Sequence, residues 1–165
     1  MPNTRFPLSP EFAKPVIIQI AGIAIVLAVL VIISQMNYLV FHSIVEIATI
    51  AIAISIFVIV WNARDTIDNG YFIVVGLAIL FIGVIDLFHT LAFKGMGVFP
   101  GNSSDLPTQL WIAARYLQAF TLLAAPLMAG RRVRTAPVLA IFSVATVFLL
   151  WTIYAGFFPS CFVEG

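Results

Sequence analysis

Five long apolar stretches dominate this chain and decide what it can fold into. They run over residues 15–34, 40–61, 71–93, 108–129 and 136–158. A helix needs roughly 20 residues to cross a hydrocarbon core of about 30 Å, and each stretch is long enough. None of them alternates with the period of two that barrel strands show, so helices are what satisfies these backbones in lipid. The sequence predicts an all-α, polytopic membrane helix bundle with five transmembrane helices.

Composition supports this fold class and excludes others. Hydrophobic residues make up 62 % of the 165 positions and charged residues only 9 %, whereas about a quarter of a soluble domain is charged. The net charge of +1 and the absence of a basic stripe exclude a nucleic-acid partner. The single cysteine, Cys161, has no second thiol for an internal disulfide. We expect one membrane-embedded domain over residues 1–165, with the lipid bilayer as its surroundings.

The basic residues predict the orientation of the chain, because cytoplasmic loops collect lysine and arginine. An amino terminus in the cytoplasm places Lys94 alone outside. It places the other basic residues of the loops and termini inside: Arg5, Lys14, Arg64, Arg131, Arg132 and Arg134. Five crossings then leave the final segment, FFPSCFVEG, outside the membrane. A signal to the cytoplasm would need further crossings, so we expect a domain that is truncated at its C-terminal end.

A few ionisable side chains fall inside the predicted helices, where an isolated charge costs about 3 kcal/mol or more. They are His42, Glu46, Asp86, His89 and Arg115. At about 1.5 Å of rise per residue, all of them lie within about 10 Å of the outer end of their helix. His42 and Glu46 are one turn apart, as are Asp86 and His89, so each helix offers a single polar patch. The sequence predicts that these patches line one polar pocket that opens to the outside.

Neighbouring side chains are expected to complete this pocket. Trp111, Arg115 and Gln118 follow one another at helical spacing on the fourth helix. We expect Arg115 to supply a counter-charge, and Trp111 and Gln118 to shape the rim and the floor. Lys94, in the loop after the third helix, is expected at the rim.

Several functions are open to such a pocket. A structural salt-bridge network of Glu46, Asp86 and Arg115, capped by the histidines, would fix the helix register and bind nothing. A metal site of the two histidines with Glu46 and Asp86 would offer the mixed ligands that suit zinc, iron, manganese or copper(II). His42 and His89 could instead be the two axial ligands of haem b. A small polar ligand, or protons taken up by the histidines, are further alternatives.

A membrane enzyme or a small transporter using the same cluster is the other class of function. A histidine beside carboxylates can catalyse hydrolysis or carry protons. However, the polar faces hold no serine or cysteine nucleophile apart from Ser43, which points away from the His42 and Glu46 side. The inner leaflet also lacks the polar groups of a continuous transport path. We therefore expect a domain without catalytic activity of its own.

Four segments of the chain resemble a known family. They read FHSIVEIATIAIAISIFVIVWNARD, GVIDLFHTLAFKGMGVF, TQLWIAARYLQAFTLLAAPL and FPSCFVEG, and they cover the chain from about Phe41 to its end. They resemble the third family of bacterial membrane-associated sensor domains, which stand at the amino termini of histidine kinases, diguanylate cyclases and PAS-containing regulators. Where that family usually carries a glutamate, this chain has Gln118.

The resemblance implies a sensory input domain in the bacterial inner membrane, with a downstream cytoplasmic signalling domain as its partner. Association into a homodimer is left open. We expect a small ligand, a metal ion or a haem-linked signal to change the tilt or rotation of the second, third and fourth helices. A ligand can do this only if it binds one arrangement of the helices more tightly than another.

Overall fold

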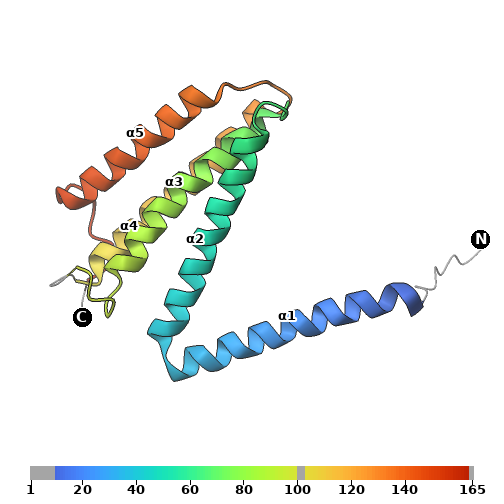
Figure 1. The fold of residues 1–165 in the computed structure, drawn as a ribbon. Coiled ribbons are helices and arrows are strands. Elements are labelled where there is room, and N and C mark those ends of the chain that lie inside the picture. The colour runs from blue at the N-terminus through green and yellow to red at the C-terminus, as the bar shows by residue number, and fades with distance from the viewer. Residues whose placement is uncertain (1–9, 100–102, 164–165) are drawn as a thin grey trace, which may run out of the picture. The chain divides into compact units, whose positions relative to one another are not determined.

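The computed structural model describes residues 10–99 and 103–163, with side chains from residue 14 onward. The described residues form five long helices and one short 3-10 helix, with no strand among them (Figure 1). In chain order these are α1 (Pro10–Met36), α2 (Tyr38–Ala63), α3 (Gly70–Ala92), α4 (Asp105–Ala124), η1 (Ala125–Met128) and α5 (Thr135–Tyr154). All five long helices are long and apolar enough to cross a membrane. The predicted all-α fold with five membrane-spanning helices is confirmed.

Two helix ends differ from the predicted ones for local reasons. The apolar stretch over residues 108–129 is divided between α4 and η1, because Pro126 has no N–H to continue the α-helical hydrogen bonds. α5 ends at Tyr154 rather than at residue 158. There Gly156 adopts a φ of +74°, and its N–H donates to the carbonyl of Ile153 at 3.1 Å, which closes the helix.

The chain divides into two compact units, Met1–His42 and Ser43–Gly165. In the first unit, α1 exposes apolar side chains around its circumference, as expected of a helix surrounded by lipid. Asn37 separates α1 from α2. Its Oδ1 accepts a hydrogen bond from the N–H of Val40 at 3.2 Å, so the carboxamide caps the start of α2.

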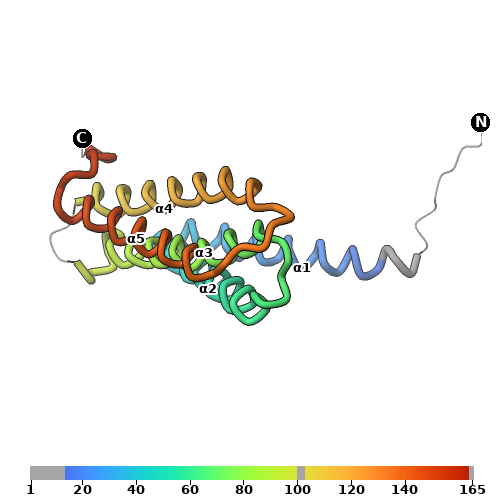
Figure 2. Tube along the Cα trace, turned by 90° about the horizontal axis from the view of Figure 1, so that it is seen from above, coloured from blue at the N-terminus to red at the C-terminus, as the bar shows by residue number. Residues whose placement is uncertain are grey.

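α3 is the central helix of the second unit. It packs against α4, η1 and α5, and Figures 1 and 2 show it running alongside α4 and α5. Ile73, Leu77 and Ile85 are almost completely buried on this helix. α3 also lies close to α2, because Gly76 has no side chain. A Cβ at that position would collide with the side chain of Val60.

Hydrogen bonds join neighbouring segments at the end of the second unit where α3 begins. The Asn69 side chain caps α3 by accepting from the N–H of Tyr71 at 3.1 Å, and it accepts from the N–H of Gly130 at 3.3 Å. The N–H of Gly70 donates to the carbonyl of Arg131 at 2.8 Å. These bonds join the start of α3 to the turn that follows η1.

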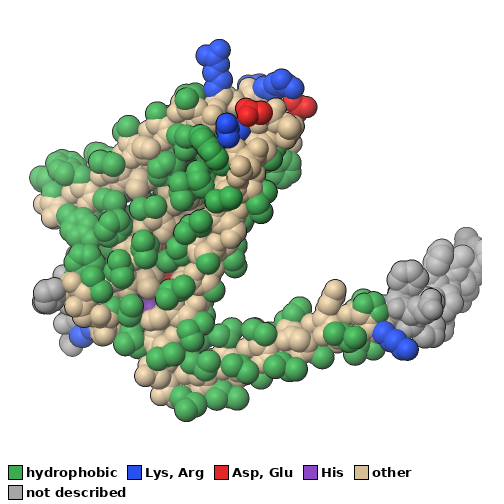
Figure 3. All heavy atoms as spheres, viewed as in Figure 1, with side chains coloured by type: hydrophobic (Ala, Val, Ile, Leu, Met, Phe, Trp, Pro, Cys, Tyr) green, Lys and Arg blue, Asp and Glu red, His purple; other side chains and the backbone are tan. Residues whose placement is uncertain are grey.

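Charged side chains gather at this same end of the second unit (Figure 3). Arg64 directly follows α2, and Arg132 forms an ion pair with Asp68 just before α3. The basic residues predicted to share one side therefore lie together within this unit, and their cytoplasmic location stays a prediction. Lys14 belongs to the first unit, and Arg5 lies outside the described residues.

At the opposite end of the second unit, the first residue of α4 holds the segment that follows α5. Asp105 Oδ1 accepts from the backbone N–H groups of Cys161 and Phe162, each at 2.7 Å. Its Oδ2 accepts from Gln109 Nε2 at 3.0 Å and from Ser160 Oγ at 3.2 Å. The segment predicted to lie outside the membrane is thus tied to the start of α4.

Candidate functional site

Asp86 of α3 and Arg115 of α4 form an ion pair inside the second unit. Arg115 Nη2 donates to both carboxylate oxygens of Asp86, at 2.8 and 2.6 Å. Asp86 is 8 % exposed, and a lone carboxylate at this depth would be costly. Arg115 Nη1 also donates to Gln118 Oε1 at 2.8 Å. The two charges therefore neutralise one another, and Gln118 adds a polar side chain one helical turn further along α4.

A second polar contact joins Glu46 of α2 to His89 of α3. Glu46 Oε1 lies 4.0 Å from His89 Nε2, and both side chains are largely buried. His89 Nδ1 lies 2.8 Å from the carbonyl oxygen of Pro107. A carbonyl can only accept, so Nδ1 carries the hydrogen. Nε2 then faces Glu46 with a lone pair when the ring is neutral and with a second N–H when the ring is protonated.

With a neutral ring, this arrangement sets two electron-rich atoms opposite one another. A carboxylate oxygen and an unprotonated ring nitrogen attract each other only through a proton or a cation between them. Metal-binding histidines commonly donate their other N–H to a backbone carbonyl, as His89 does to Pro107. The local chemistry of this pair is therefore that of a proton or metal site.

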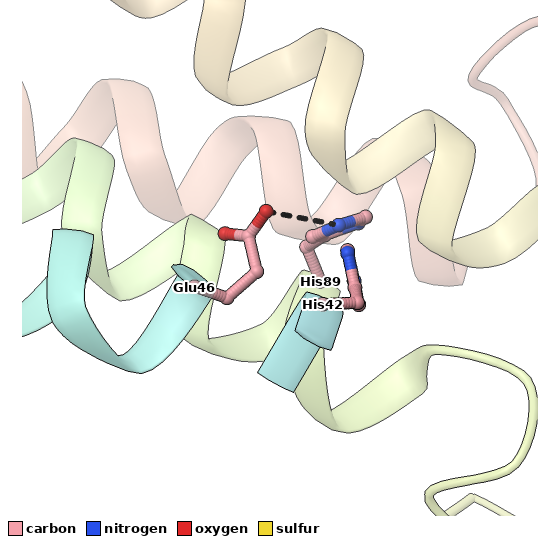
Figure 4. Close-up of side chains that lie close together, drawn as sticks. All are labelled: His42, Glu46 and His89. Carbon is pink, nitrogen blue, oxygen red and sulfur yellow. Dashed lines mark ion pairs between the residues drawn. The ribbon is translucent and has the colours of Figure 1, made fainter. Parts of the chain in front are cut away.

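His42 supplies a further imidazole on the same helix as Glu46. α2 is continuous through residue 42, so His42 precedes Glu46 by one helical turn on the same face. Ligand atoms of His42, Glu46 and His89 all lie within 4.8 Å of one another (Figure 4). Asp86 is not a member of this group. Its role as a ligand stays a prediction, while its pairing with Arg115 favours a charge-balancing role.

A cavity of about 250 Å³ adjoins the ion pair in the second unit. Asp86, Arg115 and Gln118 lie at its polar part, and its remaining walls are mostly apolar. Neither Trp111 nor Lys94 is among the described residues that line it, so their roles at a rim stay predictions. Trp111 is 47 % exposed on α4, and Lys94 is exposed in the segment after α3.

Sequence reasoning missed several groups at this site. The carbonyl of Pro107 orients His89, but a backbone acceptor leaves no signal in side-chain patterns. Thr49 and Thr121 line the cavity, although threonine is common in membrane helices and did not stand out. Asp105 precedes the apolar stretch predicted over residues 108–129, yet it begins α4 and binds the segment after α5.

Comparison with known proteins gives one family. The family model for the membrane-associated sensor domain MASE3 matches residues 33–165. No curated protein and no solved structure matches the chain significantly. The match covers most of the chain and includes every candidate site residue above. The resemblance expected from the sequence is therefore confirmed: the chain belongs to the MASE3 family of membrane-associated sensor domains, and it is a multi-pass membrane domain of signal transduction.

Proposed function

We propose that this domain senses a divalent metal ion bound between α2 and α3 by His42, Glu46 and His89. One observation carries the proposal: Glu46 Oε1 and His89 Nε2 face one another at 4.0 Å while Pro107 holds the other ring nitrogen. Zinc binds imidazole nitrogen and carboxylate oxygen at about 2.0–2.2 Å, so one ion can reach both atoms.

The donor set favours a borderline transition metal. Two imidazoles and one carboxylate suit zinc, iron or copper(II) better than magnesium or calcium, which prefer oxygen ligands. Three protein ligands would leave a position open for water or a further ligand. The Asp86 and Arg115 charges cancel, so Glu46 is the one carboxylate that would offset the charge of the ion.

The positions of the proposed ligands indicate how a bound ion would act on the helices. Glu46 and His42 belong to α2, and His89 belongs to α3. A bound ion would therefore link the two helices near the start of α2 and the end of α3. Binding shifts the helices only if one relative arrangement brings the ligands closer together than another. The downstream cytoplasmic domain proposed as a partner would then receive this change in helix tilt or rotation.

The proposed membrane is the bacterial inner membrane, with the amino terminus in the cytoplasm. The clustering of Arg64 and Arg132 at the end where α3 begins supports this orientation. Glu46 and His89 lie toward the other end of the unit. The ion would then enter from the periplasmic side.

Cobalt binding tests the metal site directly. Purified protein in detergent is titrated with Co²⁺, whose visible absorption reports bound nitrogen and oxygen ligands, and with Zn²⁺ as competitor. We expect one equivalent of metal, and at least tenfold weaker binding in Glu46→Gln, which keeps the size of the side chain and removes its charge. Elemental analysis and an optical spectrum of the untreated protein test native metal and haem together.

Asp68→Asn is the matched control, because it makes the same chemical change in an exposed residue at the far end of the unit. Absence of cobalt absorption, or equal affinity in Glu46→Gln and wild type, overturns the metal proposal. A haem absorption band would show instead that the site holds haem, with His42 and His89 as its axial ligands. In the full-length protein, output that responds to zinc in wild type and not in His89→Ala would link the site to sensing.

A further inference from the structure

The cavity beside the Asp86 and Arg115 pair is a second candidate binding site, separate from the Glu46 and His89 contact. Its volume of about 250 Å³ is far larger than a single water needs. It lies slightly below the range of about 300–1,000 Å³ typical of ligand pockets. The cavity is thus sized for a compact organic molecule rather than for a whole lipid.

The walls of the cavity are mostly apolar, and its edges face the bilayer. Ile52 of α2 and Leu122 of α4 both line it, and they are 58 % and 49 % exposed. Both residues lie well inside their membrane-spanning helices. A molecule dissolved in the hydrocarbon region could therefore enter from the side, without passing through water.

The polar part of the cavity holds balanced charges and offers an amide donor. Both oxygens of Asp86 accept from Arg115, so the carboxylate is already engaged. The Nε of Arg115 is buried and has no hydrogen-bond partner among the described residues. Gln118 uses its oxygen to accept from Arg115, which leaves its amide nitrogen to donate. A ligand at this place should bring an acceptor and no net charge.

We propose that this cavity binds a neutral, carbonyl-bearing molecule that dissolves in the membrane. Its carbonyl oxygen accepts from Gln118 Nε2 beside the ion pair, and its apolar body fills the space between Ile52, Ile79 and Leu122. A charged ligand is disfavoured because Asp86 and Arg115 already balance. This site does not depend on the proposed metal site, since the two share no proposed ligand residue.

Photolabelling with benzophenone, a neutral aromatic ketone, tests the proposal. The protein is reconstituted in phosphatidylcholine vesicles and irradiated, and the covalent adducts are located by proteolysis and mass spectrometry. We expect labelling of peptides of α2, α3 and α4 that line the cavity, saturating as benzophenone increases. Gln118→Leu, which removes the donor at similar size, should raise the half-saturating concentration about three- to tenfold.

Filling the cavity should abolish the saturable labelling. Ala53 is buried against the cavity, whereas Ala51 is exposed on the same helix. Ala53→Leu should therefore lose the saturable component, and Ala51→Leu, the matched control, should keep it. Thr121→Leu fills the cavity from α4 and replaces Ala53→Leu if that variant loses its helical circular dichroism.

Labelling that rises linearly in wild type would show partition into lipid only and overturn the proposal. Saturation that persists in a folded cavity-filling variant would also overturn it. Cobalt binding measured on the Thr121→Leu protein keeps the two sites distinguishable, because this substitution lies on α4 and leaves the contact between α2 and α3 unchanged.

Discussion

At the scale of single residues, the pair of Asp86 and Arg115 is the most consequential contact. Asp86 is nearly buried, and its partner is the guanidinium of a neighbouring helix. Removing one member of such a pair leaves an uncompensated charge, which costs more than the pair itself contributes. The pair therefore constrains which substitutions the site tolerates.

Arg115→Met should lower the free energy of unfolding by about 3–5 kcal/mol, because Asp86 would remain buried without a counter-charge. Adding Asp86→Leu to this variant should restore much of the loss. Equilibrium unfolding in mixed detergent micelles measures both variants. Asp68→Asn, at an exposed ion pair, should change stability by no more than about 0.5 kcal/mol. A double variant as unstable as Arg115→Met would contradict this account of the pair.

Cys161 offers a chemical test of the contacts around Asp105. Burial and the negative charge of Asp105 raise the pKa of the Cys161 thiol above its ordinary value, so the nucleophilic thiolate forms only at higher pH. Alkylation by iodoacetamide should be slow at neutral pH and accelerate only at pH values above the ordinary thiol pKa of about 8.5. Asp105→Asn removes that charge and should shift the rate profile to lower pH. An unchanged profile in Asp105→Asn would show that the carboxylate does not act on the thiol.

The sequence was sufficient to predict that a few ionisable groups lie at similar depth, but not which of them pair. Depth follows from counting residues along each helix. Pairing depends on how each helix is rotated, and that is set by the packing of α3 against α4. This is why the sequence left two roles open for Asp86, a ligand beside the histidines or a member of a salt-bridge network with Arg115. In the structure both of its oxygens accept from Arg115.

At the scale of helices, the close approach of α2 and α3 depends on Gly76. A Cβ on this residue would collide with the side chain of Val60, so the two helices would have to separate. Gly76→Ala should therefore lower the free energy of unfolding by about 1–3 kcal/mol. It should also weaken cobalt binding, because Glu46 and His89 lie on these two helices.

Gly22→Ala is the matched control, since a Cβ at this position of α1 meets no atom within 4 Å. Alanine favours the helix over glycine, so this variant should be neutral or slightly stabilising. Detergent unfolding and cobalt titration of the two variants check the prediction. Equal effects of both alanines would show that helix propensity, and not the contact with Val60, governs the result.

Helix number was predictable because apolar length alone reports a membrane crossing. The ends of the helices were less predictable, because they depend on local hydrogen bonding. Pro126 turns the last part of the fourth crossing into η1, and Gly156 ends α5 before the aromatic residues that extend the apolar run. The hydropathy of a segment does not reveal where either of these helices ends.

At the scale of the whole molecule, orientation is the prediction that most affects function. In a background of Cys161→Ser, Arg132→Cys should react with a membrane-impermeant maleimide only after the cells are permeabilised. Lys94→Cys should react in intact cells, because it lies in the segment at the other end of α3. The reverse pattern would place Glu46 and His89 toward the cytoplasm and exclude entry of the ion from outside.

The first turn of α4 connects His89 to the segment after α5, so it could transmit a movement of the His89 ring. The carbonyl of Pro107 accepts from the His89 ring, and Asp105, two residues earlier, holds the backbone of Cys161 and Phe162. One short piece of chain thus touches both the imidazole and the segment leaving α5. If the ring tilts to coordinate an ion, the shift has only a single helical turn to traverse before it reaches the segment that follows α5.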